Sequence, residues 1–138
     1  GGVDSNSDIT LPSTITKIDD MTFMGVANLN KVEIPSTVTA INMSVFSGCT
    51  SLTNMIIPNT VTTVGNSAFT NCYSLTSVTL SENMSQVSNN TFTNCSGLTT
   101  IVIPEGKIAT IGASAFTNCY SLTSATFNSF VNNNIKYS

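Results

Sequence analysis

The sequence predicts a solenoid, in which coils of nearly equal length stack along one axis. The first observation is a period: five Phe residues follow one another at separations of 23, 23, 23 and 24 residues. The second is a copied segment, because NSAFTNCYSLTSVTL at 66–80 returns almost unchanged as ASAFTNCYSLTSATF at 113–127. Repeats of this length mark solenoids, whose coils bury their apolar sides only against neighbouring coils. The Phe residues are Phe23, Phe46, Phe69, Phe92 and Phe116.

The other apolar positions keep a fixed distance from each Phe. A Leu comes six residues later in every coil, and Val26 followed by four Cys residues comes three residues later. One extra residue falls within IPEGKI, where Glu105–Lys107 replaces the shorter turn of the earlier coils. An insertion at a turn leaves the core undisturbed. The Leu residues are Leu29, Leu52, Leu75, Leu98 and Leu122.

Within each coil, the period of the apolar residues changes from one segment to the next. After the Leu, apolar and polar residues alternate over a short run that ends at Pro or a turn, which predicts a strand. The segment around the Phe has turn and cap residues, and we expect a short helical or 3₁₀ piece there. Each coil therefore has a strand, a turn, a short helical segment and a return loop. The expected strands are 9–11, 29–34, 52–57, 75–80, 98–103 and 122–127.

Three regions follow from these patterns. Residues 1–8, GGVDSNSD, lack the positive start and apolar stretch of a signal peptide, and we expect a linker or a cloning remnant. We expect residues 9–127 to form the solenoid and residues 128–138 to form a degenerate last coil or a tail. No dedicated capping segment is expected, so the open ends of the stack would favour self-association.

Composition excludes several kinds of function. The 138 residues include four Lys, seven acidic residues and no His, with a net charge of −3. This weak acidity gives no reason to bind nucleic acid, which needs clustered cations. No apolar run is long enough for a membrane span.

An enzyme is not expected either. A Ser or Cys nucleophile usually needs a nearby base, most often His, and the chain has none. The acidic residues are scattered, and the one adjacent pair, Asp19 and Asp20, falls at a turn where helix capping is the simpler interpretation. No Gly-rich phosphate loop is present. We predict no catalytic residues and no cofactor.

The four cysteines fall in one column of the repeat. Equivalent residues of a parallel stack lie about 4.8 Å apart with their Cβ atoms pointing the same way, whereas a disulfide needs Cβ atoms turned toward each other. A straight column also does not converge on a metal ion. We predict buried, reduced core residues and no metal site at Cys49, Cys72, Cys95 and Cys119.

The motif order resembles one family. In IPNTVTTVGNSAFTNCYSLTSVTL, the order IP, VGxxAF and CxxLTxV is similar to the BspA-like leucine-rich repeat, also called the Treponema pallidum type, over about 9–127. The resemblance implies a leucine-rich repeat solenoid, a right-handed superhelix of the α/β type with about five to six coils. It also implies a cell-surface or secreted protein of host-associated bacteria or parasitic protists, with a role in adhesion to host or microbial proteins.

Candidate contact residues lie on the outward side of the expected strands, which is the concave side of the family's solenoid. Ile56 and Val102 stand out as apolar members of a polar face. A second candidate is the pair Tyr73 and Tyr120, although covering the core edge is the simpler interpretation for both. The alternative function is a structural spacer without a ligand. The predicted protein-binding face comprises Lys31, Glu33, Asn54, Ile56, Ser77, Thr79, Thr100, Val102, Ser124 and Thr126.

Overall fold

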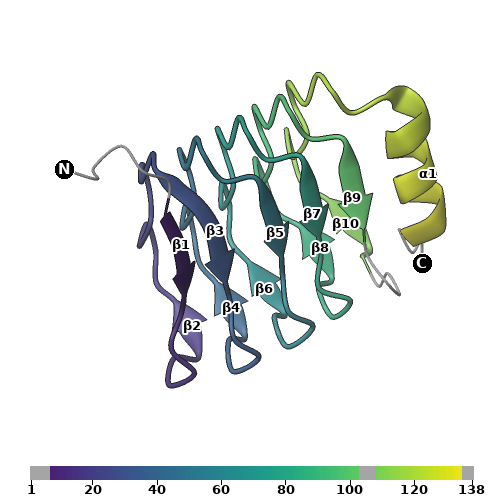
Figure 1. Cartoon of the computed structure of the whole chain (residues 1–138). Helices are drawn as coiled ribbons and strands as arrows, with labels where there is room; N and C mark the ends of the chain where they lie inside the picture. The colour runs from purple at the N-terminus through teal and green to yellow at the C-terminus, as the bar shows by residue number, and fades with distance from the viewer. Residues whose placement is uncertain (1–6, 103–107, 135–138) are drawn as a thin grey trace.

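The computed structural model describes residues 7–102 and 108–134, and these form a solenoid with two columns of parallel strands (Figure 1). Between the columns the chain turns at both ends of each coil. The longer strands form one column: β1 Ser7–Thr10, β3 Leu29–Glu33, β5 Asn54–Ile56, β7 Ser77–Thr79 and β9 Thr100–Val102. The other column holds two-residue strands: β2 Lys17–Ile18, β4 Ala40–Ile41, β6 Thr63–Val64, β8 Gln86–Val87 and β10 Thr110–Ile111.

The strands pair in the register of the sequence repeat. In the long column Met55 lies opposite Val78, and Val78 opposite Ile101, so each residue faces its counterpart one coil away. Pairing is parallel throughout and divides into four sheets, with the orders β1-β3, β5-β7-β9, β2-β4-β6 and β10-β8. The predicted solenoid of stacked 23-residue coils is confirmed.

The core consists of columns of identical side chains. The rings of Phe23, Phe46, Phe69, Phe92 and Phe116 stack along the axis, with centroids 5.4–5.5 Å apart and planes within 17° of parallel. Leu52, Leu75 and Leu98 are fully buried beside them. Each coil thus completes the core of the next, as the repeat predicts.

The segment around each Phe forms turns in which two residues have left-handed backbone conformations. In the second coil these are Ser44, at φ 56°, and Gly48, at φ 75°. They interrupt any continuous helix, so the expected helical piece is reduced to separate i→i+3 turns, such as Ser47 N to Ser44 O. We call these segments, residues 21–25, 44–48, 67–71, 90–94 and 114–118, the turn column.

Backbone hydrogen bonds between the segments of the turn column all run in one direction. Ser44, Phe46 and Gly48 donate their N–H groups to carbonyls of the following coil at 2.8–3.0 Å, and the same three positions do so at each of the four junctions. Every second N–H of each segment is thus directed along the axis, and the first and last of these three donors are the left-handed residues. Neighbouring coils are therefore joined by backbone bonds as well as by the core.

One departure in the fourth coil changes the short column. Gly65 lies so close to the preceding coil that an added Cβ would be 2.6 Å from Met43 N. Ser88 occupies the equivalent position one coil later and carries that Cβ, so β8 does not pair with β6. Its hydroxyl instead donates to Val64 O at 2.6 Å, which replaces a backbone bond.

The sixth expected strand, at 122–127, is wrong, because helix α1, Ser124–Asn134, takes its place (Figure 1). Thr123 caps this helix, since its Oγ1 accepts the N–H of Thr126 at 3.1 Å. Phe127 and Phe130 then pack edge-on against Phe116, with ring centroids at 5.3 and 6.2 Å. The helix covers part of the last coil, so the expectation that no capping segment exists is also wrong at this end.

The region boundaries shift accordingly. β1 begins at Ser7, inside the segment 1–8 expected to be a linker. α1 spans the expected boundary between 127 and 128, so residues 128–134 are helical and do not form a degenerate coil. The predicted insertion at Glu105–Lys107 and the last four residues lie outside the described residues.

Candidate binding surface

Eight of the ten predicted contact residues lie together on one side of the long strand column. We call this side, made of the outward residues of β1, β3, β5, β7 and β9, the strand face. Its residues form two rows along the solenoid axis, as the strand register sets them. One row is Asp8, Lys31, Asn54, Ser77 and Thr100, and the other is Thr10, Glu33, Ile56, Thr79 and Val102.

The remaining two predicted residues do not join this face. Ser124 and Thr126 lie on α1, where Thr126 hydrogen-bonds Thr123 in the first turn. Thr10 extends one row by one strand, as the sequence alternation predicts, and Asp8 extends the other row but was not predicted. Subtracting one repeat length from Lys31 finds Asp8.

The strand face is polar except at two positions. Ile56 is 65% exposed and Val102 is 42% exposed, whereas the residues between them are Ser or Thr. Charge is confined to the N-terminal third, in Asp8, Lys31 and Glu33. The face therefore changes along its length from charged to neutral, which identical coils would not produce.

A groove of about 550 Å³ opens on the strand face between β3 and β5. Ile9, Val32, Ile34, Ile56 and Pro58 supply its apolar walls. Its volume falls within the range of small-ligand sites, about 300–1,000 Å³. We call it the β3–β5 groove; its polar rim consists of Asp8, Thr10, Lys31, Glu33, Ser36 and Asn54.

The groove exists because these two strands do not pair. β1 with β3 forms one sheet and β5 with β7 and β9 another. After β1, β5 and β7 the next residue donates a backbone bond to the following coil, as from Ile57 N to Thr79 O at 2.8 Å and from Leu80 N to Val102 O at 2.7 Å. The equivalent bond from Ile34 N to Ile56 O is absent, and Ile34 N–H has no acceptor among the described residues.

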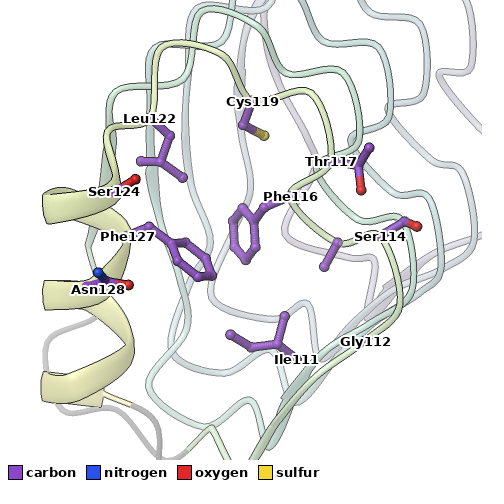
Figure 2. A pocket seen from close by; sticks show the side chains of 11 residues that line it. Ile111, Gly112, Ser114, Phe116, Thr117, Cys119, Leu122, Ser124, Phe127 and Asn128 are labelled. Carbon is purple, nitrogen blue, oxygen red and sulfur yellow. The ribbon is translucent and has the colours of Figure 1, made fainter.

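A second cavity, of about 510 Å³, lies between α1 and the last coil. Figure 2 shows the Phe127 ring pointing from the helix toward Phe116, with Leu122, Cys119 and Ile111 around them. We call it the end cavity. It marks the space that a further coil would fill and that the helix fills only in part.

The cysteine column is buried, as predicted. All four thiols are free, and each donates to the carbonyl of the Phe in the preceding coil, as Cys72 Sγ does to Phe46 O at 3.2 Å. Burial raises the pKa of Cys95 to about 12 and that of Cys49 and Cys119 to about 11. Burial likewise holds the pKa of Cys72 well above the ordinary thiol value. Because the thiolate is the reactive form, these thiols are inert at neutral pH.

The two tyrosines differ in exposure. Tyr73 is half exposed, whereas Tyr120 is 79% exposed. Tyr120 is held at the surface by a hydrogen bond from its hydroxyl to Asn118 Oδ1 at 2.9 Å.

The acidic pair lies at an exposed turn, as expected. Asp20 Oδ1 accepts the N–H of Met43 at 3.1 Å, and Asp19 lies 3.8 Å from the ammonium of Lys17. Across residues 7–102 and 108–134, no group of three His, Cys, Asp or Glu residues could hold a metal ion. Over the same residues, no helix has the length and apolar character to cross a membrane.

Stacked coils, parallel strands and columns of Leu and Phe define a leucine-rich repeat solenoid. The family model for the BspA type leucine-rich repeat region matches six copies over residues 16–138. The chain belongs to this family, which confirms the resemblance seen in the sequence. Leucine-rich repeats of this type form protein-interaction modules. No curated protein sequence is significantly similar to the chain.

Solved structures share the fold. A leucine-rich repeat protein of T. pallidum has a TM-score of 0.70 and 22% identity, over 95% of this chain and 72% of that one. A leucine-rich repeat protein of Eubacterium ventriosum has a TM-score of 0.74 and 24% identity, over 87% of this chain and 38% of that one. The pneumococcal vaccine antigen PcpA has a TM-score of 0.59 and 18% identity, over 85% and 38%. The chain thus spans much less than half the length of the last two proteins.

Proposed function

We propose that the chain is a non-catalytic protein-binding module that acts at a cell surface or outside the cell, in adhesion to host or microbial proteins. The strand face carries the contact surface. The observation that supports this most is the exposure of Ile56 and Val102 on a face that is otherwise polar. Aliphatic side chains lose contact with water when a partner covers them, and this stabilises the complex.

The shape of the face supports the same function. Protein partners need an extended surface of about 800 Å² on each side, and five strands in one column offer a continuous one (Figure 1). The change from charged to neutral along the rows gives the face a direction. A partner would therefore bind in one orientation.

A spacer without a ligand is the second candidate. The evenly stacked Phe rings and the backbone bonds at every junction suit a stiff rod. A spacer needs no apolar residue on its strand face, and nothing in its role would distinguish Ile56 from Thr79. Because Ile56 is apolar where the equivalent Thr79 is polar, we favour binding over the spacer.

The test is binding of the purified chain to arrayed host matrix proteins, serum proteins and intact microbial surfaces. We expect saturable binding that an Ile56→Ser/Val102→Ser double variant abolishes while its melting temperature stays within a few degrees. Thr63→Ser, on the opposite strand column, is the matched control and keeps full binding. A folded chain that binds none of these proteins supports the spacer. Binding that the double variant leaves intact would place the contact surface elsewhere.

Location is tested separately. Antibodies against the chain should label intact cells of the source organism or detect the protein in the culture medium. Labelling that requires permeabilised cells would contradict the surface location.

A further inference from the structure

We infer that the β3–β5 groove binds an extended segment of a partner protein that carries an aliphatic side chain with a Lys or Arg two residues away. The inference rests on the proposed function and narrows it to one part of the strand face and one ligand chemistry. Three independent features of the groove support it: an open backbone donor, an apolar slot and an unbalanced carboxylate.

The open donor is the N–H of Ile34. Three equivalent positions, Leu11, Ile57 and Leu80, bond to the carbonyl of the next coil at 2.7–3.0 Å, but Ile34 does not. Ile34 as a whole residue is 8% exposed. A buried donor without an acceptor is costly, and a carbonyl from an extended segment would satisfy it. Extended segments bind sheet edges in this way, with main-chain bonds for affinity and side-chain contacts for specificity.

The apolar slot lies beside that donor. Val32 and Ile34 retain 7% and 8% exposure, whereas their counterparts Met55 and Ile57 one coil later are 2% exposed. These two core side chains therefore keep slightly more exposure beside the gap than their counterparts do inside the β5-β7-β9 sheet. Ile56 stands at the rim and is largely exposed. An aliphatic side chain entering between the strands would cover all three, whereas a polar one would leave its own groups unpaired.

The charge of the rim selects the neighbouring residue. Asp8 accepts from Asn30 Nδ2 at 2.8 Å, and Glu33 accepts from the Thr10 hydroxyl at 3.3 Å. Neither carboxylate has an ion pair among the described residues. The rim therefore has two carboxylates and one cation, Lys31, and Glu33 has no ion pair among the described residues. A cation on the ligand would pair with it.

The spacing of side chains in an extended chain determines the position of the cation in the ligand sequence. Side chains two residues apart in an extended chain point to the same side, nearly 7 Å from one another. An aliphatic residue in the slot thus directs the side chains at both second neighbours back toward the rim. A long Lys or Arg at either place can reach the Glu33 carboxylate.

The experiment is an NMR titration of the ¹⁵N-labelled full chain with three short probes. The first is acetyl-Lys-Thr-Val-Thr-Lys-amide, and the others replace both Lys residues by Glu or the Val by Asn. We expect the first to bind with a Kd of about 1 mM, the weak end of specific recognition. Its shift changes should be confined to the amides of 32–34 and 54–56, with slower exchange of the Ile34 N–H. Both comparison peptides should bind at least several-fold more weakly.

Two variants test the predicted ion pair with Glu33 and the predicted aliphatic contact with Ile56. Glu33→Gln should weaken binding of the Lys peptide about two- to five-fold, as expected for one exposed ion pair. Ile56→Thr should weaken it roughly ten-fold, by removing an aliphatic contact. Thr already stands at the equivalent positions in β1 and β7, so the fold tolerates the change. Thr63→Ser, on β6 of the opposite strand column, is the control and should change nothing.

The outcomes separate this inference from the proposed function. If the arrayed partners bind but no peptide shifts the groove amides at several millimolar, the groove ligand is wrong and the strand-face function stands. Equal binding of the Lys and Glu peptides would overturn the charge preference. If neither the array nor the peptides bind, both proposals fail together.

Discussion

Shortening one Phe ring in the middle of the stack should cost more stability than the same change at its end. Phe69 is fully buried and its ring stacks on Phe46 and Phe92, at 5.4 and 5.5 Å. Phe23 stacks on one ring only, Phe46, at 5.5 Å. A stacked aromatic pair contributes about 0.5–1.5 kcal/mol beyond the area it buries.

The substitution is Phe→Leu at each position, which retains most of the apolar volume. Its repacking cost is usually below about 1.5 kcal/mol and is smaller at Phe23, which is only partly buried. Phe69→Leu then loses two ring pairs, or about 1–3 kcal/mol more, and Phe23→Leu loses one, or about 0.5–1.5 kcal/mol more. The central change should therefore exceed the terminal one by about 1 kcal/mol.

Urea unfolding followed by circular dichroism measures this difference. The midpoint should fall further for Phe69→Leu than for Phe23→Leu, at an unchanged slope of free energy against urea. Phe46→Leu, which also has two stacked neighbours, is the control and should match Phe69→Leu. Equal costs at Phe23 and Phe69 would refute the claim that ring pairs between coils stabilise the solenoid.

Three further predictions concern other features of the stack. Because burial raises the pKa of Cys95 to about 12, from an ordinary value of 9.0, the folded chain keeps a proton that the unfolded chain releases. Its contribution to the unfolding free energy is complete below pH 9 and is lost as the pH rises toward 12, by up to about 1.4 kcal/mol per pH unit. Cys95→Ala should reduce that slope, and an unchanged slope would exclude the thiol as its source. Gly65→Ala should lower the unfolding free energy by about 1–3 kcal/mol, since the new Cβ meets Met43 N at 2.6 Å. A thermal melt identical to that of the parent chain would contradict the close approach. Phe130→Ser should uncover Phe116, raising the fluorescence of a hydrophobic dye and the association seen by light scattering; a dye-negative monomer would show that α1 does not protect this end.

The period of the sequence was enough to predict the fold, because every coil repeats the same side chains at the same positions. Counting from one Phe places Leu75, Cys72 and Val78 in the core, and the structure buries all three. The parallel register follows from the same count, as the pairing of Val78 with Ile101 shows. Core positions and strand register are therefore predictable by counting the same number of residues from the Phe in each coil.

The strand prediction failed in the last coil because its apolar residues fit both the alternation of a strand and the spacing of a helix. Leu122, Ala125 and Phe127 fit the strand alternation of earlier coils, but Phe127, Phe130 and Val131 also have helical spacing. Local signals do not decide between the two patterns, because Thr stands at the position of Thr123 before β5, β7 and β9 as well, and no Pro follows β7. In the structure the helix packs Phe127 and Phe130 against Phe116, a tertiary contact that the sequence does not show.

The candidate site was predictable only in part. Alternation along the strands identifies which side chains face outward, and this places Ile56 and Glu33 correctly. The open N–H of Ile34 was not predictable, since it depends on whether two strands approach within hydrogen-bond distance. Val32 and Met55 occupy equivalent positions in the repeat and give no signal of that gap.

The one-way hydrogen bonds of the turn column limit how the length of such a protein can change. Every turn segment offers backbone donors on one side and acceptors on the other, as Phe46 does toward the next coil and Val45 toward the previous one. Removing or duplicating a whole coil rejoins donor to acceptor and leaves each bond in place. A partial coil shifts the remaining carbonyls away from their donors. We therefore expect genes of this type to lengthen and shorten in steps of one repeat, and engineered versions to tolerate the same steps.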